Sequence, residues 1–582
     1  MEGMTEHITA LIDFADPRGG VRVRHAFGAP LQTLAAHTLE QVKPLLDAVQ
    51  AASAQGWWCV GYVRYEAAPA FDAALTVHPA DGPLAWFAVF DIPLPWPEPS
   101  TASAQIDWHS FIPRPDFEAA MEALHQAIRA GELYQVNLTA QMAGSFSGDP
   151  QALFAALQRA QPGGYAALLD TGDAQILSVS PELFFDWRDG NILARPMKGT
   201  ARRGADAQED AALAESLRTS PKERAENVMV VDLLRNDISR IAEPFSVQVP
   251  RLFHTEALPT VWQMTSDVTA RTRPGCTLAE VFSALFPCGS VTGAPKVQAM
   301  RMVHALEPTA RGVYCGAIGV VQPGGATTFN VPIRTVTLHG TEARCGIGSG
   351  ITADAQAEGE WQEWAAKQAF VQRASAPFAL LETLAMVDGS LRHRDAHLAR
   401  MQAAAAHFGT PWNAEHVAQT LQTILRPQGA WRVRLLLDAQ GQATAEAYPL
   451  EASPASVRLQ LADRPLAEAH SEFVRFKTTR RAHYDAFTPT QPGVFDTLLW
   501  NTAGEITECT RGNIALRLAG QWVTPPLACG LLGGIGRDNA LQAGRVVEAV
   551  VRVSDLQRVE ALAFVNSLRG WLAADLDQKL SF

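Results

Sequence analysis

The chain has 582 residues, a formal net charge of -12 at pH 7 and a hydrophobic fraction of 47%. The acidic balance argues against general nucleic-acid binding, and the length and composition suit about two to four domains with large cores. We expect no membrane span, because no run approaches roughly 18 apolar residues. We also expect no signal peptide and a cytoplasmic location, because a basic-then-apolar leader is missing and the seven cysteines form no CxxC pair.

Taken in chain order, the first part predicts a mixture of strands and helices. A Pro- and Ser-rich segment at 93–105 is typical of a long surface loop, and 116–142 predicts a helix followed by a strand. Short apolar strands then alternate with helical stretches between 176 and 350, and a helix is expected at about 358–373. The segment RASAPF at 373–378 is a candidate domain boundary.

That boundary divides the chain into an expected domain at 1–373 and a second at 374–582. In the second domain, 379–409 predicts a strand, a turn and a helix. Three further strands and a Gly-rich turn leading to a helix are expected within 431–438, 493–501, 514–525 and 531–551, respectively. The overall class is therefore α/β (α+β).

Two pairs of glutamates in the first part share a three-residue spacing. Glu223 and Glu226 form one pair, and Glu360 and Glu363 the other. On a helix this spacing puts both carboxylates on one face, and two such helices facing each other would form an oxygen-rich site for a hard divalent cation. The alternative is that both pairs are ordinary solvated helix faces.

Eight short motifs surround these pairs. They are SPELFF (180–185), RPMKGTARRG (195–204), KERAENVMVVDLLRNDISR (222–240), FPCGSVTGAPKVQAM (286–300), RGVYCGAIG (311–319), NVPIRT (330–335), GIGSGITADA (346–355) and EGEWQEWAAK (358–367). In this order they resemble the chorismate-utilising enzymes, which include anthranilate synthase component I, aminodeoxychorismate synthase component I, and the isochorismate and salicylate synthases. The resemblance covers roughly 55–373 and implies two stacked antiparallel sheets with surrounding helices.

The same resemblance implies a Mg²⁺ ion and a set of chorismate contacts. Glu226 and Glu363 would hold the metal, with Glu223 and Glu360 as supporting carboxylates. The enolpyruvyl carboxylate would meet the side chains of Arg334, Tyr314 and Lys367 and the backbone of Gly348 and Gly350. The ring carboxylate would meet the metal and the backbone of Gly199 and Thr200, and Thr292 lines such sites. The alternative for Arg334 is an ordinary surface salt bridge.

Three positions indicate which reaction of this family to expect. Lys198 stands where anthranilate and isochorismate synthases typically have a small residue, and a lysine there matches the aminodeoxychorismate synthases, in which it would act as a nucleophile. Gln135 stands where isochorismate and salicylate synthases have a lysine base, and a glutamine has no titrating group to activate water. Glu182 fits the general acid. The alternative for Lys198 is a simple ion pair with a carboxylate.

The sequence departs from the family at Gln263, where many members carry a histidine, so the role of that histidine must be absent or replaced. No cysteine of the GxCxG kind is present. We therefore expect a separate glutamine amidotransferase subunit to supply ammonia.

The second domain carries four further motifs, HRDAHLARM (393–401), FVRFKTTRRAHYD (473–485), GEITECTRGNIAL (504–516) and LLGGIGRDNAL (531–541). In this order they resemble the fold-type IV pyridoxal-phosphate enzymes. The resemblance implies a covalent cofactor link to Lys477, a partner for the pyridine nitrogen in Glu508, and a phosphate site made by Arg400 and the backbone of Ile535 and Gly536. Relatives often have a threonine where Gly536 stands, so one phosphate hydrogen bond is expected to be missing.

Other residues of the second domain allow two interpretations. Arg432 and Arg434 alternate with Val433, so they project from one side of a strand and are either substrate-carboxylate ligands or a plain exposed face. Thr383 is a candidate for the site wall, and Asn513 for ordering the turn after Glu508. Lys477 could alternatively be a solvated cation in its basic stretch.

Together the two resemblances predict a fusion that converts chorismate into p-aminobenzoate. Fold type IV does not itself choose between transamination and elimination, so this choice follows from the fusion partner. One alternative is anthranilate synthase component I fused to an aminotransferase, which Lys198 disfavours. Another is a catalytically degenerate scaffold, which the intact glutamates and both lysines disfavour. A homodimer through the second domain is also expected.

Overall fold

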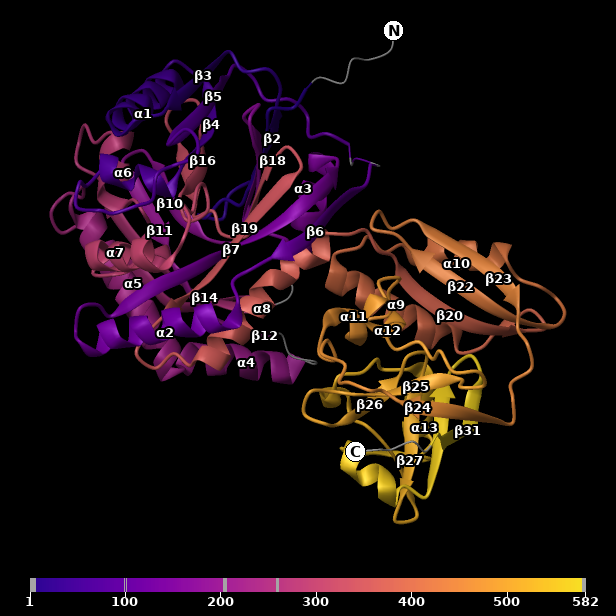
Figure 1. Ribbon diagram of the computed structural model, residues 1–582. Coiled ribbons are helices and arrows are strands. Elements are labelled where there is room, and N and C mark those ends of the chain that lie inside the picture. Colours follow the sequence, from indigo (N-terminus) through magenta and orange to yellow (C-terminus); the bar gives the residue numbers. More distant parts are fainter. Residues whose placement is uncertain (1–6, 99, 101, 203–206, 258–260, 578–582) are drawn as a thin grey trace, which may run out of the picture. The chain divides into compact units, whose positions relative to one another are not determined.

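The computed structural model describes residues 7–98, 100, 102–202, 207–257 and 261–577 (Figure 1). The chain divides into two compact units, Met1–Pro377 and Phe378–Phe582. Each unit is described by itself below.

Unit 1 contains two sheets. Among the described residues, the first has the order β15 (Gly293–Ala294), β7 (Gln135–Gly148), β19 (Glu342–Ile351), β18 (Thr335–His339), β9 (Gln175–Ser180), β8 (Tyr165–Asp170), β1 (Ala10–Phe14) and β2 (Val23–Phe27), with β6 (Ala104–Ser110) also paired to β7. The second has the order β12 (Met197–Arg202), β14 (Val261–Arg271), β11 (Asn191–Arg195), β10 (Leu183–Arg188), β17 (Thr327–Asn330), β16 (Ala317–Val321), β4 (Trp58–Val63), β5 (Ala85–Phe90) and β3 (Gln32–Ala36), with β13 (Gln248–Ala257) paired to β14.

The two sheets are antiparallel throughout these pairings and stack face to face. Buried side chains of both sheets, such as Ile12 of β1 and Val60 of β4, share one hydrophobic core. This confirms the stacked antiparallel sheets predicted from the sequence. Such packing follows from strands that are apolar on their inward faces.

Helices cover the two outer faces of this stack. A second core joins the first sheet to α2 (Arg114–Arg129), α3 (Pro150–Ala160), α7 (Lys296–Leu306) and α8 (Ala357–Ala374). A third core joins the second sheet to α1 (Leu39–Ala54), α5 (Pro221–Ser239), α6 (Leu278–Leu285) and η1 (Tyr65–Ala70). Helix α4 (Ala207–Thr219) and the short η2 (Gly289–Val291) complete the described helices of this unit.

The helix that carries the first glutamate pair begins with a capping serine and a proline. Ser220 caps α5 by accepting a hydrogen bond from the backbone N–H of Glu223, and Pro221 occupies the first helical position. Val230 and Leu234 bury the middle of the helix against the second sheet. This anchoring leaves the first turns, with Glu223 and Glu226, free to face a cavity.

Unit 2 has a smaller and a larger sheet. Among the described residues, the smaller is antiparallel, with the order β21 (Ser390–Leu391), β20 (Leu380–Val387), β22 (Ala430–Leu437) and β23 (Ala443–Pro449), and it packs on α9 (Arg394–Phe408) and α10 (Ala414–Thr423). The larger has the order β26 (Ile506–Cys509), β25 (Asp496–Trp500), β24 (Ser456–Leu461), β31 (Gly570–Leu576), β30 (Ala561–Asn566), β27 (Asn513–Leu518), β28 (Gln521–Thr524) and β29 (Val547–Glu548). The pairs of β24 with β25 and β31, and of β28 with β29, are parallel.

Short helices connect these strands, and one is shorter than predicted. They are α11 (Glu472–Arg475), α12 (Ala482–Asp485), η3 (Leu527–Cys529), α13 (Ile535–Gln542) and η4 (Val553–Arg558). The helix expected within 531–551 ends at Gln542, because Gly544 adopts a left-handed backbone with φ +64° and the chain then forms β29.

Two sequence expectations concern cysteines and membranes. All seven cysteines are free thiols. Across the described residues, no helix combines the length and apolar character that crossing a bilayer requires.

Candidate active sites

Unit 1 holds a cavity of about 440 Å³ where α5 and α8 meet the strands that carry the sequence motifs. It brings together most of the residues predicted for chorismate and metal binding, namely Glu182, Lys198, Gly199, Thr200, Glu223, Glu226, Tyr314, Arg334, Gly348, Gly350, Glu360, Glu363 and Lys367. Gln135 and Thr292 do not line it. Thr292 is fully buried, and its hydroxyl donates to the carbonyl of Cys288 at 3.0 Å, so its side chain lies behind the cavity wall.

Lys198 and Gln135 meet at a glycine. A methyl group placed on Gly350 would lie 3.0 Å from Nζ of Lys198 and 2.3 Å from Nε2 of Gln135. Gln135 is 2% exposed, and its Nε2 has no hydrogen-bond partner in the described part of the chain. The amine of Lys198 therefore lies beside an amide that cannot titrate.

Glu182 lies between β9 and β10 and is buried at the cavity wall. Burial raises the pKa of its carboxyl to about 7, although Ser290 and the charge of Lys198 act in the opposite direction. Its Oε1 has no hydrogen-bond partner among the described residues. A carboxyl group with this pKa holds a proton near neutral pH and can donate it to a leaving group.

The two glutamate pairs face the same cavity from α5 and α8. Burial raises the pKa of Glu223 and of Glu226, and the charge of Glu363 adds to both shifts. Burial acts to raise the pKa of Glu363 as well, but Lys367 lowers it. Nζ of Lys367 lies 2.6 Å from Oε1 of Glu363. Glu360 accepts a hydrogen bond from the hydroxyl of Ser349.

These carboxylates fit a magnesium site of open type. No three His, Cys, Asp or Glu side chains of the described residues converge into a group that could enclose a metal. Mg²⁺ commonly uses only one or two carboxylates together with water and substrate oxygens. Neighbouring carboxylates such as Glu223 and Glu363, whose charges raise the pKa of Glu226, are donors whose repulsion such a cation would relieve.

Positive charge for a carboxylate substrate comes from Arg334 and Lys367. Nη1 of Arg334 donates to the carbonyl of Lys367 at 3.2 Å, and Nζ of Lys367 donates to the carbonyl of Gly348 at 2.9 Å. No carboxylate of the described residues forms an ion pair with Arg334, so the surface salt bridge considered above is not seen. Its guanidinium, packed over Phe370 at 5.2 Å, keeps its charge available for an anion.

Arg311 is a supporting residue that the sequence analysis missed. Its fully buried guanidinium donates to both carboxylate oxygens of Glu307, at 2.8 and 2.7 Å, and to the carbonyls of Val291 and Asn137. Val291 and Asn137 line the cavity, so this network holds part of its wall. The available signal was an arginine inside an otherwise apolar motif, since buried charges are paired when they occur.

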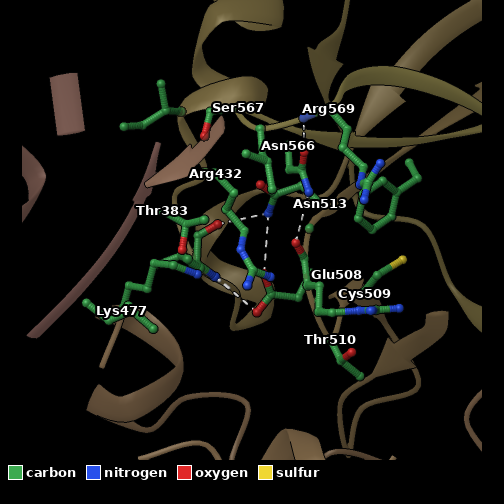
Figure 2. A pocket seen from close by; sticks show the side chains of 18 of the residues that line it. Thr383, Arg432, Lys477, Glu508, Cys509, Thr510, Asn513, Asn566, Ser567 and Arg569 are labelled. Atoms are coloured by element: carbon green, nitrogen blue, oxygen red, sulfur yellow. Dashed lines mark hydrogen bonds between the residues drawn. The ribbon is translucent and has the colours of Figure 1, made fainter. Parts of the chain in front are cut away.

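Unit 2 holds a second cavity, of about 570 Å³, between its two sheets. Figure 2 shows Thr383, Arg432, Lys477, Glu508 and Asn513 around it. Arg400 and Ile535 also line it, but Arg434 and Gly536 do not. A methyl group on Gly536 would lie 2.7 Å from the carbonyl carbon of Asn566, which explains why no threonine side chain fits at this position.

In this cavity Glu508 is buried and Lys477 is half-buried. Burial, followed by the charges of Arg481 and Arg400, lowers the pKa of Lys477 to about 8. Burial raises the pKa of Glu508 to about 7. Glu508 accepts hydrogen bonds from the hydroxyl of Tyr484 at 2.6 Å and the backbone N–H of Leu532 at 3.2 Å. Tyr484 lies in a motif quoted above, but the sequence analysis gave it no role.

Arg400 is fixed by a carboxylate that the sequence analysis also missed. Nε and Nη2 of Arg400 donate to the two oxygens of Glu382, and its Nη1 donates to the carbonyl of Gly533 at 2.9 Å. Gly533 lies just before α13, whose first residue is Ile535. An arginine beside a helix N-terminus suits a phosphate group, and a lysine and a buried carboxylate share the cavity, so the donor set fits pyridoxal phosphate.

Comparison with known proteins matches two stretches of the chain to two families. Residues 93–373 match the family of chorismate binding enzymes, and residues 379–575 match the class IV amino-transferases. The chain therefore combines a chorismate-binding N-terminal domain with a C-terminal domain of the class IV aminotransferase type.

Individual relatives match about half of the chain or somewhat more. Aminodeoxychorismate synthase component 1 of Klebsiella aerogenes is 39% identical over 280 residues, which are 48% of this chain and 61% of that protein. The protein of the same name from Salmonella typhimurium is 39% identical over 289 residues, 50% of this chain and 63% of that protein. The chain thus spans less than two thirds of the length of either. The crystal structure of anthranilate synthase component I from Streptococcus pneumoniae matches with a TM-score of 0.50 and 26% identity, over 64% of this chain and 93% of that one.

Proposed function

We propose that the chain makes p-aminobenzoate from chorismate in two steps. The first unit would aminate chorismate to 4-amino-4-deoxychorismate, and the second would eliminate pyruvate from that product. The observation that carries this proposal is the placement of Lys198 and Glu182 on one cavity, with burial raising the pKa of Glu182 to about 7 and a glutamine rather than a base at position 135. The names of the curated relatives support it.

In the first step, Nζ of Lys198 would attack C2 of the ring. Both ring double bonds shift, to C1=C6 and C4=C5, the bond from C4 to its hydroxyl breaks, and Glu182 gives the departing oxygen a proton, so that water leaves. Ammonia then attacks C4, both double bonds shift back, and the bond from C2 to Nζ breaks, which returns the electron pair to Lys198 and regenerates its amine. Gln135 cannot deprotonate a competing water molecule.

Binding in this step would use the charges around the cavity. Arg334 and Lys367 would hold the enolpyruvyl carboxylate, together with Tyr314 and the backbone of Gly348 and Gly350. Glu226 and Glu363 would hold a Mg²⁺ ion, with Glu223 and Glu360 beside them. That ion would supply positive charge for the ring carboxylate.

Ammonia would come from a partner. The curated relatives are named component 1. We therefore propose a separate glutamine amidotransferase subunit for this chain as well. Homodimer formation and a cytoplasmic location stay predictions.

In the second step, bound pyridoxal phosphate would supply the electron sink. Lys477, when neutral, would remove the C4 proton of 4-amino-4-deoxychorismate. The bond from C3 to the enolpyruvyl oxygen would break, the enolpyruvate would take up a proton to become pyruvate, and the ring would become aromatic. Glu508 would hold the pyridine nitrogen, and Arg400 with the backbone of Ile535 would hold the phosphate.

The test is to supply the purified protein with chorismate, Mg²⁺, pyridoxal phosphate and ammonium, and to separate the products by chromatography. Equal amounts of p-aminobenzoate and pyruvate are expected. Anthranilate as the aromatic product would instead support the alternative fusion. Two variants separate the halves: Lys198→Ala should still convert supplied 4-amino-4-deoxychorismate, whereas Lys477→Ala should accumulate it. If Lys198→Ala aminated chorismate at the wild-type rate, Lys198 would not be the nucleophile.

A further inference from the structure

The lysine of the first cavity lies in an irregular part of its strand. On β12 and β14, Met197 is opposite Thr265 and Thr200 is opposite Gln263, so three steps along β12 match two along β14. The extra residue makes a β-bulge, which Lys198 and Gly199 form between these two pairs. Gly199 has a left-handed φ of +86°. A bulge changes the direction in which a side chain points, so the direction of Lys198 depends on this local backbone.

Gln263 binds this bulge with both ends of its amide. Its Nε2 donates to the carbonyl of Gly199 at 2.7 Å, and its Oε1 accepts a hydrogen bond from the hydroxyl of Thr200 at 3.0 Å. The side chain is 7% exposed and lines the cavity. A buried amide that is hydrogen-bonded at both ends in this way holds two consecutive residues in one geometry.

The opposite side of the bulge has no spare room. A methyl group on Gly199 would lie 2.6 Å from Oε2 of Glu223. The backbone that follows Lys198 is therefore enclosed between Gln263 of β14 and Glu223 of α5. In the described part of the chain, no hydrogen bond or ion pair holds Nζ of Lys198, so its aim is set by its backbone.

We propose that Gln263 is a positioning residue for the amination, which aims Lys198 by fixing the bulge at Gly199 and Thr200. This inference rests on the proposed function of Lys198 as the nucleophile. A glutamine suits the task because it offers one donor and one acceptor at every pH. A glutamate would offer only acceptors when ionised and would repel the carbonyl of Gly199.

The experiment compares full-length Gln263→Leu and Gln263→Glu with wild type at saturating chorismate, Mg²⁺ and ammonium. Because misplacing a reacting group by about 1 Å costs about 10²-fold, we expect kcat for amination to fall about 10- to 100-fold in both variants. The KM for chorismate should change less than kcat does, because Arg334 and Lys367, which would hold the enolpyruvyl carboxylate, lie outside the bulge. The conversion of supplied 4-amino-4-deoxychorismate should stay unchanged.

Gln141→Leu is the matched control. Gln141 is a half-buried glutamine of β7 in the same unit, and its Nε2 donates to the carbonyl of Ala310 at 2.6 Å. Its loss removes a hydrogen bond that involves neither β12 nor β14, so kcat should stay within about twofold of wild type. An equal fall in kcat for Gln141→Leu and Gln263→Leu would overturn the proposal, as would a kcat for Gln263→Leu within threefold of wild type.

A second measurement does not depend on the reaction. Reductive methylation with ¹³C-formaldehyde labels lysines for NMR, and Lys198→Arg identifies the Lys198 signal. That signal should shift or broaden in Gln263→Leu and stay in place in Gln141→Leu. An unchanged Lys198 signal in Gln263→Leu would overturn the positioning role, even if the wild-type protein formed no aminated product and the proposed function itself failed.

Discussion

Glu382 and Arg400 form a two-point ion pair at the wall of the second cavity, with Nε donating to Oε1 at 2.8 Å and Nη2 donating to Oε2 at 2.7 Å. Glu382 is 1% exposed, and its Oε2 also lies 2.7 Å from Nδ1 of His397. Burial acts to raise the pKa of Glu382, but the charge of Arg400 and these hydrogen bonds lower it to about 2. The guanidinium is thus held in place before any ligand binds.

Glu382→Ala should weaken pyridoxal phosphate binding. Removing one partner of a buried ion pair costs about 3–5 kcal/mol and leaves Arg400 without its support. We expect the Kd for the cofactor, measured by absorbance titration, to rise at least about tenfold. Glu415→Ala, on an exposed turn of α10, is the control and should bind the cofactor as wild type does. An unchanged Kd for Glu382→Ala would contradict the role given to this pair.

The same pair predicts a pH dependence of stability. Because the folded pKa of Glu382 lies below its unfolded value of about 4.3, its contribution is present above that value and is lost as pH falls toward 2. The difference in melting temperature between wild type and Glu382→Ala should therefore shrink between about pH 4.3 and 2. A constant difference over this interval would be inconsistent with an ionised Glu382.

Lys477 should capture the cofactor with a rate that depends on its protonation. Only the neutral amine reacts with an aldehyde, and the pKa of Lys477 is lowered to about 8. The rate at which the visible absorption band appears after adding pyridoxal phosphate should rise as pH passes through about 8 and level off above it. Lys477→Ala should give no such band, and a band in this variant would assign the cofactor link to another lysine.

Glu182 should set the alkaline limb of the pH–rate profile of the amination. Its raised pKa of about 7 means that the carboxyl is protonated below that pH and loses its donor proton above it. Amination by the wild-type protein should therefore decline as pH rises beyond about 7. Glu182→Gln should show no such decline, and its kcat should be about 10²- to 10⁴-fold lower than that of wild type. An unaltered alkaline limb in Glu182→Gln would assign the proton donor elsewhere.

Gly350→Ala should disable the first cavity while the unit stays folded. The added methyl group would meet Gln135 at 2.3 Å and Lys198 at 3.0 Å, so one of the two side chains must move. We expect amination to fall at least about tenfold because the nucleophile is displaced. Gly359→Ala is the control, since its methyl group would meet nothing within 4 Å on α8 and should stabilise that helix by about 0.5–1 kcal/mol. Equal activity of both variants would argue against the contact at Gly350.

Several features could be read from local patterns alone. The shared helix face of Glu223 and Glu226 follows from a three-residue spacing, and the motif order was enough to predict both domain families. The short α13 was not foreseen, because the helical pattern around Gly544 does not reveal that this residue adopts a left-handed backbone. Glu382 and Arg311 were missed because a buried charge looks like a surface charge until its partner is known.

By itself, the amino-acid sequence determined which functional groups each cavity could contain, since helix periodicity and turn preferences act over a few neighbouring positions. Only the tertiary structure decided that Lys198 would lie against Gly350 beside Gln135. It also decided that Gln263 would donate a hydrogen bond to the backbone carbonyl of Gly199. These contacts join residues far apart in the chain. They depend on strand register and on one extra residue in β12, which no local pattern specifies.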